Sequence, residues 1–178
     1  MTPAWRNRLI ALALAAAIYL VDRWIKGLVM GPWDLREVGQ IYLLPFFNLT
    51  FTQNFGVSFG QLAATSPEMR WGLVALTGLI AAVVLVWLLR ERKLGEMAGL
   101  APILGGAAGN IHDRIQYGWV IDYADFHIGG FRPFLIFNVA DAAITIGVLI
   151  ILARALFMRE KPARSQDEKA ADPPAETI

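Results

Sequence analysis

The sequence contains no cysteine and only two histidines, His112 and His127, among its 178 residues. Without cysteine the chain can form no disulfide, no thiolate metal site and no cysteine nucleophile. Two histidines are too few for a histidine-rich metal site, so we expect neither a metal nor another cofactor. Any chemistry must therefore come from carboxylates, amides, hydroxyls and basic side chains.

Charged residues are also scarce, at 17% of the chain, and they gather at the ends of long apolar runs. Hydrophobic residues make up 56%, and the mean hydropathy of +0.48 is high for a soluble domain. The net charge of +1 gives no reason to expect a nucleic-acid partner, because the basic residues flank apolar segments. The pattern indicates an integral membrane protein with one domain.

Four apolar runs have the length and composition of helices that cross about 30 Å of hydrocarbon. We expect these spans at 9–30, 71–89, 94–113 and 134–155. The run Leu9–Leu20 after Arg6 and Arg8 is also compatible with a cleaved signal peptide, but the apolar character continues to Met30, which favours a retained first span.

Small residues and turn signals refine the second and third spans. Ser66-Pro67-Glu68 has the capping serine, the first-position proline and the early acid that begin a helix. The third span carries the pairs Gly95/Gly99 and Gly105/Gly109, whose spacing allows helices to approach closely in lipid. We therefore expect the third span at the centre of the bundle.

The segment 31–65 is not a span. Ile41–Phe51 and Phe55–Phe59 are rich in aromatic and β-branched residues on either side of a turn at Asn54-Phe55-Gly56, which predicts short strands. Their hydrophobicity predicts a small sheet that rests on the membrane surface. The predicted fold class is an all-α membrane protein, with four transmembrane helices in residues 1–160 and a β-rich outer subdomain between the first two. The charged tail 161–178 should be disordered.

Basic residues predict the orientation of the spans. They lie before the first span, between the second and third, and after the fourth, and four spans place these three regions on one side. That side is the cytoplasm, so both termini should be cytoplasmic and both long loops should face outward.

Asp141 is the only formal charge in the apolar run Phe134–Ala153. An aspartate at membrane depth costs roughly 2.5–3.5 kcal/mol on insertion scales, so its retention suggests a use. Asn138 should share its helix face. We place Asp141 about two turns below the outer end of its helix, or ~10 Å, where Asp122 could meet it from the second outer loop.

Two carboxyl groups in a low-dielectric site share a proton, and their pKa values separate. One can then activate a water while the other donates a proton, which is the chemistry of aspartic peptide hydrolysis. Spacing alone leaves alternatives open: Asp141 could form an interhelical hydrogen bond or pair with Lys26 or Arg114, and Asp122 could be an exposed loop residue. Asp22 and Lys26 at i, i+4 are read as a structural ion pair, and Arg114 as a partner for Asp113, a substrate carbonyl or a lipid phosphate.

Two functions of other classes fit the same residues. One is a small proton- or cation-coupled carrier with Asp22, Lys26 and Asp141 as relay groups. The other is an assembly subunit whose glycine-rich third span docks a partner helix.

Taken together, the motifs resemble those of the bacterial lipoprotein signal peptidases (signal peptidase II), an intramembrane aspartic protease family. The similarity runs from about Arg8 to Arg154 and rests on five ordered segments. These are Asp22-Arg-Trp-Ile-Lys26, Asn54-Phe-Gly-Val-Ser-Phe59, Gly105-Gly-Ala-Ala-Gly-Asn-Ile-His-Asp-Arg114, Val120-Ile-Asp122-Tyr-Ala-Asp-Phe126 and Phe137-Asn-Val-Ala-Asp141.

The resemblance implies Asp122 and Asp141 as the catalytic pair. It implies substrate-binding positions around them, which are Asn54, Gly56, Asn110, Arg114 and Asn138, and supporting positions at Asp22, Lys26 and Asp113. It implies a substrate, a prolipoprotein whose lipobox cysteine carries a diacylglyceryl group and which is cut before that cysteine. It further implies a location in the bacterial inner membrane, in contact with membrane lipid, with the active site at the outer, periplasmic leaflet. The sequence leaves the oligomeric state open, and a monomer is the default expectation.

Overall fold

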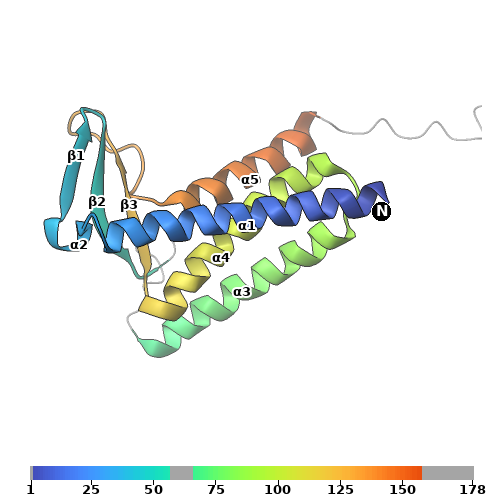
Figure 1. The fold of residues 1–178 in the computed structure, drawn as a ribbon, viewed down its shortest axis with the longest axis horizontal. Helices are drawn as coiled ribbons and strands as arrows, with labels where there is room; N and C mark the ends of the chain where they lie inside the picture. The colour runs from blue at the N-terminus through green and yellow to red at the C-terminus, as the bar shows by residue number, and fades with distance from the viewer. Residues whose placement is uncertain (1, 57–65, 158–178) are drawn as a thin grey trace, which may run out of the picture.

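The structure is a computed structural model that describes residues 2–56 and 66–157. Within them, long helices run side by side and a small sheet lies across one end of the bundle, opposite the N-terminus (Figure 1). The long helices are α1 (Pro3–Met30), α3 (Pro67–Arg90), α4 (Leu94–Tyr117) and α5 (Val139–Phe157). Of the helices described, α3 and α5 are long and apolar enough to cross a membrane.

The sequence signals at the helix ends act as expected at α3. Ser66 is its N-cap, with Pro67 in the first turn, and the Ser66 hydroxyl accepts the Met69 N–H at 3.3 Å. This confirms the predicted start. At the end of α4, Gly118 adopts a left-handed φ of 88°, which closes the helix before the chain turns into a strand.

Helix α4 is the centre of the bundle, as predicted, and it contacts α1, α3 and α5. Its glycines make this packing possible. A Cβ on Gly105 would overlap the Ala15 carbonyl of α1, and one on Gly106 would overlap the Ala140 carbonyl of α5. Backbone therefore meets backbone on two sides of α4, which is the close approach that small residues permit in lipid.

The sheet has three antiparallel strands in the order β1 (Gln40–Leu44), β2 (Phe47–Asn54), β3 (Val120–Phe126). The one-turn helix α2 (Leu35–Val38) precedes it. The buried side of the sheet packs on the end of α1, where Val29, Leu35 and Ile121 are fully buried in one apolar cluster. The third strand comes from the second long loop, so the subdomain joins both loops rather than only the first.

The strands differ from the sequence prediction. The run Ile41–Phe51 holds most of both strands of a hairpin, because Pro45 has no N–H for the ladder and the chain turns there. The predicted strand Phe55–Phe59 is not formed at Phe55 and Gly56, and its remainder lies outside the described residues. The predicted tail 161–178 also lies outside them.

The last helix begins at Val139 rather than near Phe134. The preceding segment is extended, because Phe137 pairs with Ala124 of β3 through backbone hydrogen bonds at 2.7 and 3.1 Å. The apolar residues before Asn138 therefore belong to the loop and to the edge of the sheet.

Candidate active site

Asp141 lies in the first turn of α5 and not two turns inside it, because the helix begins later than the hydrophobic run suggested. Asn138, just before the helix, accepts the Asp141 N–H through Oδ1 at 2.8 Å. The Asn138 N–H donates in return to Asp141 Oδ2 at 3.3 Å. This reciprocal arrangement is a capping box, so Asn138 is the helix cap rather than a member of the same helical face.

Asp122 points from β3 toward the same place and is only 2% exposed. Its Oδ1 accepts Asn138 Nδ2 at 2.7 Å, and its Oδ2 accepts Asn54 Nδ2 at 3.0 Å. Asn138 therefore bonds both aspartates, one through its amide and the other through its backbone. The predicted meeting of Asp122 and Asp141 occurs at the junction of the sheet and the α5 N-terminus.

Asn110 of α4 is held in one orientation by its neighbours. Its Oδ1 accepts Asn138 Nδ2 at 3.2 Å and the Lys26 ammonium at 3.3 Å. The amide nitrogen must then face the other way, and it donates to Asp141 Oδ1 at 2.8 Å. Both oxygens of Asp141 thus accept a hydrogen bond from fixed donors.

Arg114 lies one helical turn beyond Asn110 and is buried. Its Nη2 donates to the Gly56 carbonyl at 2.9 Å, whereas its buried Nε has no hydrogen-bond partner in the part of the chain that the structure describes. Gly56 is itself held by its N–H, which donates to Asn54 Oδ1 at 3.0 Å. The predicted turn at Asn54-Phe55-Gly56 therefore exists, as a side-chain-capped turn at the end of β2.

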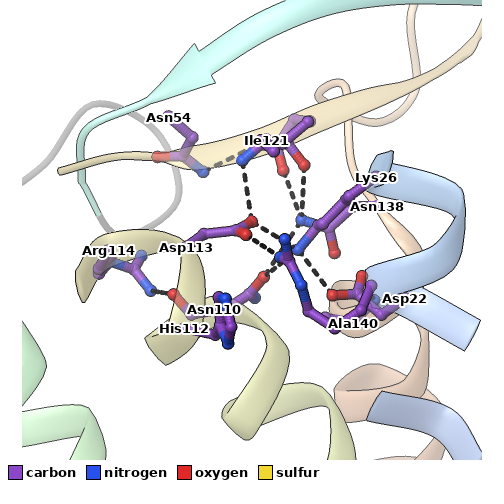
Figure 2. Close-up of polar contacts among 12 residues, drawn as sticks. Asp22, Lys26, Asn54, Asn110, His112, Asp113, Arg114, Ile121, Asn138 and Ala140 are labelled. Carbon is purple, nitrogen blue, oxygen red and sulfur yellow. Dashed lines mark hydrogen bonds and ion pairs between the residues drawn. The ribbon is translucent and has the colours of Figure 1, made fainter. Parts of the chain in front are cut away.

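An ion-pair network supports these residues from the side of α1 (Figure 2). Lys26 Nζ contacts Asp22 Oδ2 at 2.9 Å and Asp113 Oδ2 at 2.7 Å, and all three side chains are fully buried. Arg23 pairs with the other oxygen of Asp113. Hence Lys26 pairs with neither aspartate of the site. Of the alternatives for Arg114, pairing with Asp113 is not formed, because Asp113 pairs with Arg23 and Lys26 of α1.

Sequence reasoning gave Arg23 no role. Its position in the last third of the first span could have predicted a role, because an arginine within a span needs a partner. All the site residues predicted from the sequence lie in this one polar network.

The electrostatics of the two acids on β3 differ although both are almost fully buried. Burial, followed by the charge of Asp141, raises the pKa of Asp122 to about 7. The Asp125 carboxylate instead accepts two hydrogen bonds from Arg132, at 2.9 and 3.1 Å, and these hold its pKa below the ordinary value. Asp122 can therefore carry a proton near neutral pH, whereas Asp125 is an ionised structural partner.

Most of the chain matches a known protein family. The family described as "Signal peptidase (SPase) II" matches residues 14–157 of the chain. The chain belongs to the signal peptidase II family. Signal peptidase II enzymes are membrane proteases, so this chain is a membrane protease.

Curated relatives of signal peptidase II cover nearly the whole chain. A lipoprotein signal peptidase from Sphingopyxis alaskensis is 50% identical over 161 residues, covering 90% of this chain and 93% of the relative. One from Rhizorhabdus wittichii is 50% identical over 163 residues and covers 90% and 95%. The similarity therefore includes every segment that contributes to the polar network.

Solved structures share the signal peptidase II fold seen here. A bacterial membrane enzyme solved at 2.3 Å by the in meso method matches with a TM-score of 0.73 and 24% identity, covering 88% of this chain and 94% of the other. A second, solved at 1.9 Å, matches with a TM-score of 0.71 and 26% identity, covering 85% and 94%.

Proposed function

We propose that the protein is an aspartic endopeptidase that removes signal peptides from diacylglyceryl-modified prolipoproteins and cuts before the lipidated cysteine. The observation that carries the aspartic mechanism is the position of Asn138, whose amide bonds Asp122 at 2.7 Å and whose backbone bonds Asp141 at 3.3 Å. Two carboxyl groups that share such a partner can act on one water molecule. The substrate follows from family membership and from the names of the curated relatives.

Asp122 and Asp141 would take different roles in the reaction. Because Asp122 has a pKa near 7, we assign it the resting proton, and Asp141 acts as the base. Asp141 accepts a proton from water while the water oxygen attacks the scissile carbonyl, and Asp122 donates its proton to the carbonyl oxygen. Collapse of the tetrahedral intermediate breaks the C–N bond as the proton taken up by Asp141 passes to the departing amine. One hydroxyl proton of the intermediate returns to Asp122, which restores the starting state of both acids.

Arg114 and Asn54 would hold the substrate beside the two acids. The Nε of Arg114 has no hydrogen-bond partner among residues 2–56 and 66–157, so it could donate to a peptide carbonyl. The charge of Arg114 balances the single negative charge of an acid pair that holds one proton. Asn54 links Asp122 to the turn at Gly56, so a peptide seated there would contact both.

The arrangement of the helices supports a site near one membrane surface. The sheet lies at the end of the bundle opposite the N-terminus (Figure 1), and the polar network lies where β3 of that sheet meets the start of α5. Basic residues gather at the other end, where Arg8 bonds the Glu91 carbonyl and Arg154 pairs with Glu96. By the positive-inside rule that end is cytoplasmic, so the site lies at the periplasmic leaflet of the inner membrane, with all four long helices crossing it.

The test is cleavage of a purified, diacylglyceryl-modified precursor, with the unmodified precursor alongside. Asp122→Asn and Asp141→Asn should each reduce cleavage of the lipidated precursor by at least a thousandfold, since each removes a proton-transfer group. Asp125→Asn, on the same strand as Asp122 but outside the network, should cut at the wild-type rate. Equal cleavage of both precursors would contradict the substrate assignment, and cleavage by either of the first two variants would contradict the mechanism.

A further inference from the structure

Each aspartate of the site follows a residue whose backbone N–H donates a hydrogen bond to a buried carboxylate. The N–H of Ile121, which precedes Asp122, donates to Asp113 Oδ2 at 3.2 Å. The N–H of Ala140, which precedes Asp141, donates to Asp22 Oδ1 at 3.1 Å. The two acids of the site thus have equivalent supports that come from different helices, α4 in one case and α1 in the other.

Lys26 joins these two supports. Its ammonium lies 2.7 Å from Asp113 Oδ2 and 2.9 Å from Asp22 Oδ2. Figure 2 shows the resulting chain, in which Lys26 lies between Asp113, below Ile121, and Asp22, beside Ala140. We call this five-residue chain, Ile121–Asp113–Lys26–Asp22–Ala140, the Lys26 clamp.

We propose that Lys26 is a positioning residue that fixes the separation of Asp122 and Asp141 through this clamp. The inference rests on the proposed function, because it assigns a role in that reaction. The ammonium contacts neither Asp122 nor Asp141, so its action is indirect. It also contacts Asn110 Oδ1 at 3.3 Å, which turns the Asn110 amide nitrogen toward Asp141.

Stability alone does not require this arrangement. Replacing a buried ion pair by apolar groups of similar volume is often neutral or stabilising, so a buried lysine between two aspartates is weak evidence for a role in stability. Geometry gives a better reason, since displacements of about 1 Å at reacting groups can change rates a hundredfold.

The β-bridge between Ala124 and Phe137 is a second tie between the same two segments. It lies after Asp122 in the strand, whereas the clamp acts on the residue before it. With both ties in place, β3 cannot pivot about the bridge and carry Asp122 away from Asp141.

The double variant Asp22→Asn with Lys26→Met tests the clamp. The amide introduced by Asp22→Asn would keep a carbonyl oxygen for the Ala140 N–H, and Asp113 keeps Arg23 and the Ile121 N–H. One positive and one negative charge are lost together, so no buried charge is left unpaired. The variant removes the contacts of the ammonium with Asp22, Asp113 and Asn110. The matched control is Glu96→Gln with Arg154→Met, which removes an α4–α5 ion pair at the far end of the bundle.

We expect the double variant to show a kcat at least tenfold below wild type with a KM within twofold, at a temperature where size exclusion and thermal unfolding show a folded protein. The control should keep its wild-type kcat. Gly109→Ala is a second test, because its Cβ would displace the Asp22 Oδ2 that Lys26 contacts while leaving every charge in place. It should also lower kcat more than it raises KM.

Wild-type kcat in either folded clamp variant overturns the positioning role, and so does a failure of both variants to fold, which would make the network a requirement of folding. A loss confined to KM overturns it too. These results are distinct from failure of the proposed function, in which the wild type leaves the lipidated precursor uncut or Asp122→Asn still cleaves it.

Discussion

The raised pKa of Asp122 makes the stability of the protein depend on pH in a predictable direction. Asp122→Asn removes the titrating group while keeping its shape. In the wild type, the folded state holds the Asp122 proton up to a pH of about 7, whereas the unfolded chain releases it near 3.8. Stability from this group is therefore fully present below the lower value and is lost as the pH rises through the upper one.

The magnitude follows from the two pKa values. Their difference of about three corresponds to roughly 4 kcal/mol of lost stability at a pH well above 7, at about 1.36 kcal/mol per unit. At pH 5 the loss is smaller, roughly 1.7 kcal/mol, because only the unfolded chain has begun to ionise. The advantage of Asp122→Asn over wild type should thus grow by about 2.5 kcal/mol between pH 5 and pH 8.5. Any pH-independent effect of the substitution cancels in this comparison.

The measurement is denaturant unfolding in detergent micelles at both pH values. Asp125→Asn is the control, because hydrogen bonds from Arg132 lower the Asp125 pKa. The Asp125 carboxylate stabilises the folded state at any pH above the pKa that it has in the unfolded chain. This stabilisation is lost only as the pH falls through the lowered pKa of the folded state. The difference in unfolding free energy between Asp125→Asn and wild type should therefore stay constant between pH 5 and 8.5. A constant difference for Asp122→Asn as well would refute the reasoning.

Two further predictions concern the packing and capping of α5. Gly106→Ala would press a methyl group against the Ala140 carbonyl and should lower the free energy of unfolding by about 1–3 kcal/mol. Gly78→Ala is the control, because the space at its Cβ is open and its free energy of unfolding should not fall in this way. Thermal unfolding of the two variants compares them. Asn138→Ser keeps a cap oxygen but loses the amide donor to Asp122, so it should lose activity yet stay about 1 kcal/mol more stable than Asn138→Ala. Equal stability of the two Asn138 variants would argue against the capping box.

The sequence is informative about the helices because their signals are local. Length, apolar character and the cap at Ser66 are properties of short segments, and the glycines of α4 announce close packing wherever the partners lie. The structure also places the residues named by the motif resemblance in one polar network. That information came from the identity of the residues and not from any periodicity.

Tertiary contacts explain what the sequence left undetermined. The apolar run before Asn138 resembles the start of a span, yet pairing of Phe137 with Ala124 keeps it extended. Likewise, β3 joins a strand that lies about seventy residues earlier in the chain, and no local pattern encodes that register. The partners of Lys26 could not be chosen from spacing, because Asp22 is a helical neighbour whereas Asp113 is brought in by helix packing.

The hydrogen bond from the Ala140 N–H to Asp22 joins residues 118 positions apart, from the first and last long helices of the described chain. Ribosomes make proteins from the N-terminus, so a nascent chain that ends with α4 has Asp22, Lys26 and Asp113 but lacks Asp122, Asn138 and Asp141. The half-made product therefore lacks both acids of the proposed site, and it lacks Asn138, which caps α5 and orients Asp141. Under the mechanism proposed above, hydrolysis therefore requires that α5 has been made and that its first turn has docked on Asp22 of α1.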